Sequence, residues 1–467
     1  MKPLSIQEIK QAIGAKLVAP LPTALPLIST VSHNSLEVDP GSLFIAIRGE
    51  NKDGHVYLPD AASKGAIAAI VEEPPRTPQP NMHLLVVENS RKAMGKLATY
   101  ARRQLRSKVI AVAGSNGKTS TKYLIASALC QKLKGSFSPK SFNNDIGVPV
   151  AIFPADPSQD YLVLELGTNH HGEIKVLTDM ALPDIAVITN CGAEHLEFLG
   201  DLAGVRKENA SIIAGLNPKG TLIVNGDDEL LLDAVAGYQG QKITFGFSDR
   251  NDLFATDIRC HDRGTTFKLN DRREFFVPML GRHNACNALA AIAVARRMGL
   301  QEEVIAESLA VADGPEMRLQ RDDLQSITLI NDAYNANPNS MTAAMETLRD
   351  LHASGRKIAI LGDMRELGPM GPQFHREVGS AAAGCELDLL ICVGRDGALI
   401  ADGAIRAGMS KTKVKTFADA ELAIEKIPAG IRTGDLVLLK ASRGVRLERV
   451  AEAIRNRIEA KARKAAS

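Results

Sequence analysis

The stretch that decides the fold reads Val109-Ile-Ala-Val-Ala-Gly-Ser-Asn-Gly-Lys-Thr-Ser120. Residues 109–113 are apolar and partly β-branched, which predicts a buried strand, and the glycines after them predict a tight loop before a helix. Such a loop presents backbone N–H groups to an anion. The Lys118 ammonium can reach outer phosphates, and the Thr119 hydroxyl can bind Mg²⁺. We therefore predict a phosphate-binding loop made of Gly114, Ser115, Asn116, Gly117, Lys118, Thr119 and Ser120.

The match to the usual phosphate-loop pattern covers only its second half. The full pattern has a glycine six residues before the lysine, and this chain has Val112 there. A purely structural turn is therefore the alternative interpretation of this segment. The position of the loop between an apolar strand and a helix favours phosphate binding.

Composition limits the class of protein. The chain has 467 residues, of which 45% are hydrophobic and 24% charged, so it is a globular protein too long for one core. The net charge is 56 − 54 = +2 and aromatic residues make up 4%, which argues against a nucleic-acid partner. No apolar run is long enough to span a membrane, and no secretory signal is evident. The six cysteines form no CxxC pair, so we expect no zinc site and a cytoplasmic protein.

Strand and helix patterns divide the chain into three stretches, residues 1–88, 89–313 and 314–467. The pattern of residues 1–88 predicts a small α/β domain. The second continues with buried strands at 161–166, 185–189 and 221–224, an antiparallel insert at 242–280 and a helix at 283–298. The third alternates strands and helices as a doubly wound sheet does, with strands at 327–330, 357–361, 387–393, 414–417 and 436–440. The predicted fold class is α/β with three domains.

Two further residues lie where a parallel sheet would deliver them to the loop. Glu165 ends one predicted strand, and His195 follows the next strand along the chain. Because the carboxyl ends of parallel strands meet at one edge, we expect both near Lys118. A carboxylate there would bind the metal that accompanies nucleotide phosphates. The alternatives are a half-exposed edge residue for Glu165 and a structural histidine for His195.

Several sequence blocks together resemble the Mur ligase family, ATP-dependent enzymes that form amide bonds in peptidoglycan precursor synthesis. In the central stretch the blocks are GSNGKTS, ELGTNHHGEI (165–174), AEHLE (193–197) and GRHNACNALAA (281–291). The blocks NDAYNANPNSM (331–341), ILGDMRELG (360–368) and KASRG (440–444) resemble the branch that joins D-alanyl-D-alanine to UDP-N-acetylmuramoyl-tripeptide. The block PGSLFIAIRG (40–49) is similar to the UDP-sugar-binding domain of that branch.

This resemblance implies an activity and its cofactors. ATP would phosphorylate the terminal carboxylate of the UDP-linked tripeptide, and the dipeptide amine would attack the acyl phosphate. ATP and two Mg²⁺ ions are the implied cofactors. A small UDP-binding domain, a central ATPase-like domain and a C-terminal Rossmann-like domain are the implied parts. A monomer is favoured, while the third residue of the tripeptide, lysine or diaminopimelate, stays open.

The resemblance also assigns site residues. Lys118, Glu165 and His195 would be catalytic, with Thr119 and Glu165 on one Mg²⁺ and His195 on a second. His283, Asn284 and Asn287 would face the adenine, and spacing alone places the two asparagines on one helix face, where a capping cluster is the alternative. Arg318 would bind phosphate and Asp332 the ribose. The contacts proposed for the two substrates are Ser32, Asn34, Asn335, Asn337, Lys440, Ser442 and Arg443.

The chain departs from the family pattern at two places. Fourteen residues after His195 the family commonly has a carbamoylated lysine that supports the second metal, and here Asn209 stands there. Lys207 is two residues away, a rotation of about 200° on a helix, so it lies on the wrong face. The second metal site therefore either uses Asn209 as a neutral ligand or is weaker. In the uridine block, Asn34 and Leu36 replace an acidic residue and an arginine.

Two other functions compete with this assignment. One is another amide ligase of the superfamily, a Mur ligase that adds a single amino acid or a folylpolyglutamate synthase. The other is a nucleotide-dependent switch or kinase that uses the phosphate loop alone. The switch would turn over ATP without an amide product and would leave the third domain unexplained.

Overall fold

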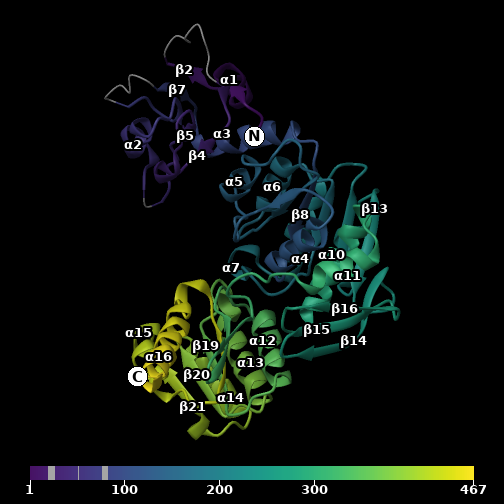
Figure 1. The fold of residues 1–467 in the computed structure, drawn as a ribbon, viewed down its shortest axis with the longest axis vertical. Coiled ribbons are helices and arrows are strands. Elements are labelled where there is room, and N and C mark those ends of the chain that lie inside the picture. The colour runs from purple at the N-terminus through teal and green to yellow at the C-terminus, as the bar shows by residue number, and fades with distance from the viewer. Residues whose placement is uncertain (19–26, 51, 76–81, 467) are drawn as a thin grey trace.

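The computed structural model describes residues 1–18, 27–50, 52–75 and 82–466. Three sheets of five, nine and six strands follow one another along the chain, and a small pair joins β1 (Leu4–Ser5) to β3 (Leu27–Ile28). Figure 1 shows them in sequence order from the purple N-terminal end to the yellow C-terminal end. Each large sheet lies inside one of the three stretches expected from the sequence. The exact limits of these three domains stay predictions. The α/β fold with largely parallel sheets is confirmed.

The N-terminal sheet is a small parallel sheet with one antiparallel edge. Its strand order is β2 (Lys16–Leu17), β7 (His83–Val86), β6 (Ala68–Val71), β5 (Leu43–Ile45) and β4 (Val31–Ser32). Only β2 runs antiparallel to its neighbour. The helices here are α1 (Ile6–Ile13) and α2 (Leu58–Ser63). Ser5 begins α1 with a capping box to Glu8, which satisfies two free backbone donors.

The central sheet brings the predicted strands side by side. β8 (Lys108–Ala113) lies between β10 (Tyr161–Glu165) and β11 (Ile185–Ile188), and all three are parallel. Glu165 pairs in register with Val112, so it ends beside the glycine loop. The sheet continues through β9 (Gly135–Phe137) on one side and through β12 (Thr221–Asn225) and β13 (Gln241–Gly246) on the other. This order places three strand ends at one edge, as the sequence predicts.

The antiparallel insert is shorter than predicted. β14 (Leu253–His261), β15 (Gly264–Leu269) and β16 (Arg273–Val277) are antiparallel to one another. β13, which falls inside the predicted insert, instead pairs parallel with β12 and extends the main sheet. Its alternating polar residues reflect its position away from the buried centre of the sheet.

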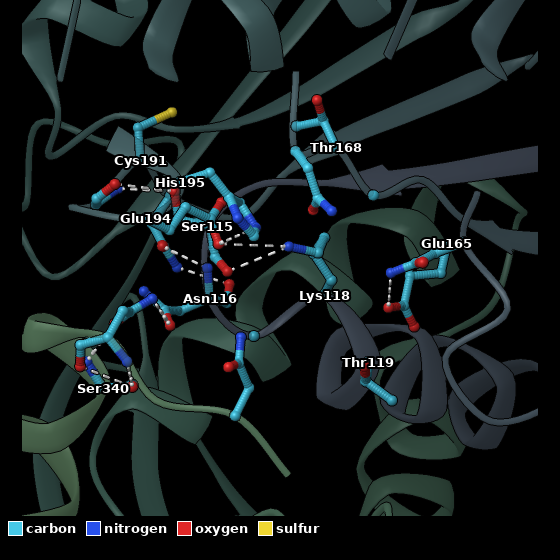
Figure 2. A pocket seen from close by; sticks show the side chains of 18 of the residues that line it. Ser115, Asn116, Lys118, Thr119, Glu165, Thr168, Cys191, Glu194, His195 and Ser340 are labelled. Atoms are coloured by element: carbon cyan, nitrogen blue, oxygen red, sulfur yellow. Dashed lines mark hydrogen bonds and ion pairs between the residues drawn. The ribbon is translucent and has the colours of Figure 1, made fainter. Parts of the chain in front are cut away.

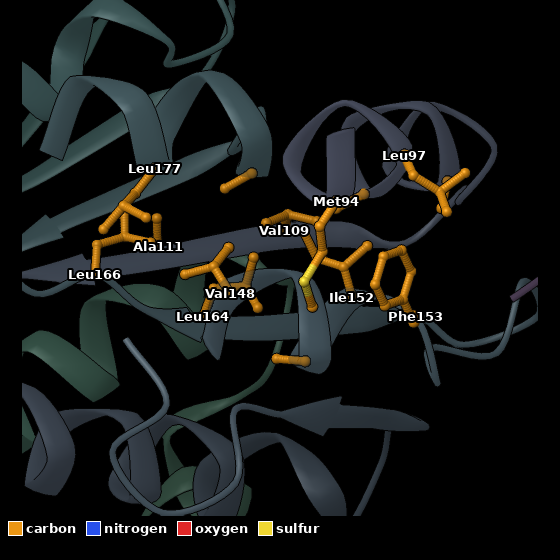
Figure 3. Packing of buried hydrophobic residues seen from close by; sticks show 14 of the residues in the cluster. Met94, Leu97, Val109, Ala111, Val148, Ile152, Phe153, Leu164, Leu166 and Leu177 are labelled. Atoms are coloured by element: carbon orange, nitrogen blue, oxygen red, sulfur yellow. The ribbon is translucent and has the colours of Figure 1, made fainter. Parts of the chain in front are cut away.

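Helices cover both faces of the central sheet. Val109 and Ala111 of β8 pack with Met94, Leu97 and Leu164 on one face (Figure 3), under α3 (Ser90–Arg103), α5 (Gly147–Ile152) and α6 (Glu173–Ala181). Ile110 and Val112 point to the other face, under α4 (Lys118–Cys130) and α10 (His283–Arg297). Successive strand residues point to opposite faces, so burial on both faces produces the continuous apolar run. The remaining helices are α7 (Leu196–Leu199), α8 (Leu202–Ala210), α9 (Glu229–Ala234) and α11 (Glu302–Ala310).

The C-terminal sheet has the order β17 (Gln320–Leu324), β18 (Ile327–Asp332), β22 (Leu436–Lys440), β19 (Lys357–Gly362), β20 (Leu389–Val393) and β21 (Val414–Phe417). Five strands are parallel, and β17 is an antiparallel edge strand that the sequence does not predict. The helices are α12 (Pro338–Asp350), α13 (Gly371–Ala383), α14 (Gly397–Arg406), α15 (Ala420–Gly430) and α16 (Glu448–Ala466). Among the described residues, no helix has the length and apolar character that a membrane crossing requires.

The described residues also form six short 3-10 helices. They are η1 (Ser35–Glu37), η2 (Gly54–Tyr57), η3 (Ser211–Ala214), η4 (Gly368–Met370), η5 (Lys411–Lys413) and η6 (Arg443–Val445).

Candidate active site

A cavity of about 1190 Å³ lies between the central and the C-terminal sheets. Its walls include the glycine loop, the ends of β10 and β11, and the segment after β18, and Figure 2 shows part of this lining. Sixteen of the predicted site residues line it. Eleven come from the central domain and five from the C-terminal domain: Ser115, Asn116, Gly117, Lys118, Thr119, Ser120, Glu165, His195, His283, Asn284 and Asn287, then Arg318, Asp332, Asn335, Asn337 and Lys440.

Two positions in the loop require glycine. Gly114 has φ +128°, and a Cβ there would lie 2.1 Å from the Thr189 hydroxyl oxygen. Gly117 has φ +80°, and its Cβ would lie 2.4 Å from Oδ1 of Asn287. Both conformations are ones that side chains rarely adopt. The loop therefore packs closely against β11 and α10, and Lys118 and Thr119 begin α4 directly after it.

Lys118 lies folded over its own loop. Its Nζ donates to the backbone oxygens of Gly114 and Ser115, the second at 3.2 Å, and lies 4.0 Å from Oε2 of Glu194. Glu194 is buried, and that burial raises the pKa of its carboxyl group, partly offset by Lys118. Sequence reasoning missed Glu194, although a charged residue directly before His195 in an otherwise small and apolar segment was available as a signal.

Glu165 is held on both carboxylate oxygens. Its Oε2 lies 3.1 Å from Nζ of Lys122, and its Oε1 accepts a hydrogen bond of 3.1 Å from the Asn143 amide. Lys122 also donates to the backbone oxygen of Lys140. Burial lowers the pKa of Lys122 although Glu165 raises it. Sequence reasoning missed Lys122, which follows Lys118 by one helical turn in the motif KTSTK.

His195 joins the central and C-terminal domains. Its Nδ1 forms a hydrogen bond with Oε2 of Glu366, which lies in the loop after β19. Its Nε2 lies 3.9 Å from Oε2 of Glu194. The ring therefore stands between two carboxylates, one from each domain, and Figure 2 shows it beside Glu194 and the glycine loop.

The first turn of α10 forms a polar wall of the cavity. The Asn287 amide donates to Oδ1 of Asn284 at 2.9 Å, which confirms that the two share a face. The Asn284 amide donates to the backbone oxygen of Leu280, and no side chain caps α10, so the capping alternative is not what the structure shows. Burial lowers the pKa of His283 to about 4, so this ring is neutral near pH 7.

The C-terminal domain supplies charged groups to the same cavity. The Arg318 guanidinium lies 4.2 Å from the centroid of the Tyr334 ring. Asp332 pairs with Lys440 at 2.7 Å, and burial lowers the pKa of Lys440. The Lys440 ammonium also donates to the backbone oxygen of Asn335 at 3.0 Å. One oxygen of Asp332 is thus engaged with Lys440, and the other accepts from the backbone of Leu319.

Asn337 contacts the phosphate loop itself. Its amide donates to Oδ1 of Asn116 at 2.9 Å, and Asn339 accepts from the backbone of Ala193 at 3.1 Å. Asn337 also begins α12 as its N-cap. The predicted substrate contact therefore links the two domains in this structure.

Other predicted substrate residues lie outside this cavity. The Ser442 hydroxyl accepts from the Arg365 backbone at 3.0 Å, and Arg443 lies 3.6 Å from Glu448. In the N-terminal domain the Ser32 hydroxyl accepts from the backbone of Asn34 at 3.0 Å. Oδ1 of Asn34 accepts from the backbone of Leu36, whose side chain is 78% exposed. The contacts of Ser32 and Asn34 are local turn contacts, whereas Ser442 bonds segments distant in the chain. The substrate roles of all four side chains stay predictions.

Asn209 and Lys207 also stand away from the cavity lining. The Asn209 amide donates to the backbone oxygen of Val205 on its own helix at 3.0 Å, and its Oδ1 is buried without a hydrogen-bond partner among the described residues. Lys207 is exposed. This arrangement favours the weaker second metal site over a site that uses Asn209 as a ligand.

Asp363, His375 and Asp396 form a second cluster of possible metal ligands in the C-terminal domain. The His375 ring bonds the backbone of Met364 and Gly371 through its two nitrogens. The Asp363 carboxylate accepts from two successive backbone N–H groups, those of Arg395 and Asp396. These hydrogen bonds fix the loops at the ends of β19 and β20.

Comparisons with known proteins agree with this geometry. Three family models match: Mur ligase family, catalytic domain, over residues 27–103; Mur ligase middle domain over residues 112–295; and Mur ligase, glutamate ligase domain, over residues 317–443. The UDP-N-acetylmuramoyl-tripeptide–D-alanyl-D-alanine ligase of Bacillus subtilis is 35% identical over 426 residues, which cover 91% of this chain and 92% of that protein.

Solved structures match over nearly the whole chain. MurF from Acinetobacter baumannii superposes with a TM-score of 0.88 at 29% identity, covering 98% of this chain and 99% of that one. The MurF ligase of Thermotoga maritima, solved in complex with ADP, has a TM-score of 0.81 at 28% identity and covers 92% of this chain and 98% of that one. The chain belongs to the Mur ligase family, in the group of the UDP-N-acetylmuramoyl-tripeptide–D-alanyl-D-alanine ligases.

Proposed function

We propose that this protein is the ligase that joins D-alanyl-D-alanine to UDP-N-acetylmuramoyl-tripeptide, with ATP converted to ADP and phosphate. One observation carries the proposal: a single cavity brings the phosphate loop and buried carboxylates of the central domain against cationic groups of the C-terminal domain. The product is the UDP-linked pentapeptide used in peptidoglycan synthesis. We place the reaction in the cytoplasm and expect a monomer.

The reaction proceeds in two balanced steps. A terminal carboxylate oxygen of the tripeptide attacks the γ-phosphorus of ATP, and ADP leaves, so the tripeptide carries an acyl phosphate. The dipeptide amine then attacks the carbonyl carbon, loses a proton and expels phosphate as the amide forms. The enzyme's task is to bring two anions together and to protect the activated carboxylate from water.

The loop and Lys118 provide positive charge for the first step. The backbone N–H groups at the start of α4 face the cavity and can cradle phosphate oxygens. Lys118 now bonds two loop carbonyls, and moving its ammonium to the outer phosphates would exchange those neutral acceptors for anionic ones. Arg318 of the C-terminal domain, which lies against the Tyr334 ring, is a second cation that lines the same cavity.

A separate set of cavity-lining residues would bind the nucleoside half of ATP. The amide groups of Asn284 and Asn287 face the cavity beside Gly117 and suit an adenine edge. Asp332 reaches the cavity from the C-terminal domain, where its carboxylate suits ribose hydroxyls. These roles follow the assignment made from the sequence and depend on the C-terminal domain lying against the loop.

The donor groups fit Mg²⁺. The Thr119 hydroxyl and the Glu165 carboxylate are oxygen donors that line the cavity beside the loop, and oxygen donors are the ligands that Mg²⁺ prefers. We propose one ion at Thr119 and Glu165 and a second, weaker one at His195. When bound, Mg²⁺ neutralises phosphate charge and orients the groups that react.

Contacts across the two domains hold the C-terminal domain over the phosphate loop, an arrangement that would help to keep water from the activated carboxylate. Asn337 bonds the phosphate loop and Asn339 bonds the segment before His195, so the C-terminal domain covers the loop directly. Asn335 and Lys440 line the cavity and are proposed contacts of the peptide substrates. Ser32 and Asn34 are proposed for the uridine end, and Ser442 and Arg443 for the dipeptide.

Phosphate release tests the function. Purified protein with ATP and Mg²⁺ is given both substrates, then each alone, and the product is identified by mass spectrometry. Release should require both the UDP-linked tripeptide and the dipeptide, and Lys118→Ala should abolish it. ADP formation independent of the dipeptide would favour a kinase or switch, while turnover with a single amino acid would favour another amide ligase of the superfamily.

A further inference from the structure

The loop after β19 packs directly on the segment that carries His195. The Glu366 carboxylate accepts a hydrogen bond from Nδ1 of His195, and the Glu366 backbone oxygen accepts from the backbone N–H of Glu197 at 3.2 Å. Gly368 lies against Glu197 as well, since a Cβ added there would lie 3.4 Å from the Glu197 Cα. The contact therefore involves backbone and side chain and joins two domains.

Both partners of this hydrogen bond have left-handed backbone conformations. His195 has φ +50° and Glu366 has φ +61°, and neither is a glycine. Such conformations are uncommon for residues with side chains, and where the surrounding structure maintains them they cluster at functional positions. Here they occur on both sides of one interdomain contact.

The contact determines what the histidine presents to the cavity. With Nδ1 donating to a carboxylate, a neutral imidazole carries its proton on Nδ1 and a free electron pair on Nε2. Nε2 lies 3.9 Å from Oε2 of Glu194, on the side of the phosphate loop. Glu366 itself is not among the residues that line the cavity, so it acts on the site through His195.

We propose that Glu366 is a positioning residue that holds Nε2 of His195 ready to bind a divalent cation, and that it does so only while the C-terminal domain lies against the central domain. This inference rests on the cation role of His195 in the proposed function. Docking of the C-terminal domain and cation binding at His195 then favour each other, because each is stronger in the presence of the other. The cation site of one domain is thus completed by a residue of the next.

The first test observes the imidazole directly. Protein labelled with ¹⁵N-histidine and saturated with ADP is compared with Glu366→Ala, and His195→Gln assigns the His195 signals among the 10 histidines. The wild-type His195 ring should show the Nδ1–H tautomer. Glu366→Ala should lose that preference, and Glu366→Gln, which keeps an acceptor oxygen, should retain part of it. Identical His195 signals in the wild type and Glu366→Ala would overturn the proposal.

The second test measures cation binding without turnover. Mn²⁺ is titrated into the ADP-bound protein and followed by electron paramagnetic resonance, with Glu452→Ala, an exposed residue of α16, as the matched control. Glu366→Ala should weaken the weaker Mn²⁺ site by about 10- to 100-fold, the usual effect of removing a carboxylate behind a histidine ligand. If Glu366→Ala changed the His195 tautomer but bound Mn²⁺ as tightly as the wild type, the proposal would also be overturned.

Neither readout requires amide formation. If the wild type lacked ligase activity but both tests gave the expected results, the proposed function would fail while the coupling of Glu366 to His195 would stand. Thermal melts of Glu366→Ala and Glu366→Gln show whether each variant folds.

Discussion

The Nζ atom of Lys122 lies 3.1 Å from Oε2 of Glu165, and the two side chains are 0% and 1% exposed. Removing one partner of a buried ion pair is strongly destabilising, because the other charge is then buried without compensation. The pair stands behind the phosphate loop and fixes one oxygen of the carboxylate proposed to bind Mg²⁺.

Lys122→Met leaves Glu165 buried without its cation. We expect it to lower the free energy of unfolding by about 3 to 5 kcal/mol, the cost typical of breaking a buried pair. Denaturant unfolding measures this, and the double variant Lys122→Met/Glu165→Gln should recover much of the loss because no buried charge remains. A double variant as unstable as the single one would contradict the explanation.

Gly117→Ala tests the close approach of the loop to α10. The new Cβ would lie 2.4 Å from Oδ1 of Asn287 at φ +80°, so the loop must shift and ADP affinity should fall at least tenfold. Gly299→Ala is the matched control, because Gly299 has φ +86° with nothing within 4 Å of the added Cβ. It should cost only backbone strain of about 1 kcal/mol. Calorimetric titration measures the ADP affinity of both variants, which should be unchanged in Gly299→Ala, and denaturant unfolding measures their stability.

Asn337 has two roles that substitution can separate. Its amide bonds Asn116 across the domains, and its Oδ1 caps α12. Asn337→Ser keeps a capping oxygen but loses the reach to Asn116, whereas Asn337→Ala loses both. We expect kcat to fall by roughly tenfold in both variants, as loss of about 1.4 kcal/mol implies. Only Asn337→Ala should also lose about 1 kcal/mol of stability. Equal stability in the two variants would show that the cap is unimportant.

His283 makes stability depend on pH. Its pKa in the folded protein is about 4, below the ordinary 6.5, so the unfolded chain binds the proton more tightly. Burial of the neutral His283 ring therefore costs no proton-binding free energy above pH 6.5. As the pH falls from 6.5 towards 4, the unfolded chain gains a proton that the folded protein does not bind, and the free energy of unfolding decreases. By pH 5 the loss reaches about 2 kcal/mol at most. Unfolding at pH 7.5 and pH 5 should show a larger difference for the wild type than for His283→Gln. Equal differences would rule His283 out as the cause.

The sequence predicts the parallel framework well because burial leaves a strong pattern. β8, β10 and β11 are buried on both faces, so each reads as an unbroken apolar run, and their strand ends define the site. β17 reads Gln-Arg-Asp-Asp-Leu and carries no such run, because an edge strand needs backbone pairing but little burial. Lys122 and Glu366 escape prediction for a different reason. Their roles depend on what they face in space, 43 and 171 residues away along the chain.

The helix α3 has a consequence for how the chain unfolds. Its buried residues Met94 and Leu97 belong to one continuous core that includes Ile6 and Ile9 of α1 as well as Val109 of β8. The C-terminal sheet has cores of its own. The N-terminal and central sheets should therefore melt together as one cooperative unit, and a chain cut near residue 88 would expose an apolar face to water. The C-terminal sheet, packed mainly on its separate cores, should unfold as a second unit, so the molecule has two cooperative units despite its three sheets.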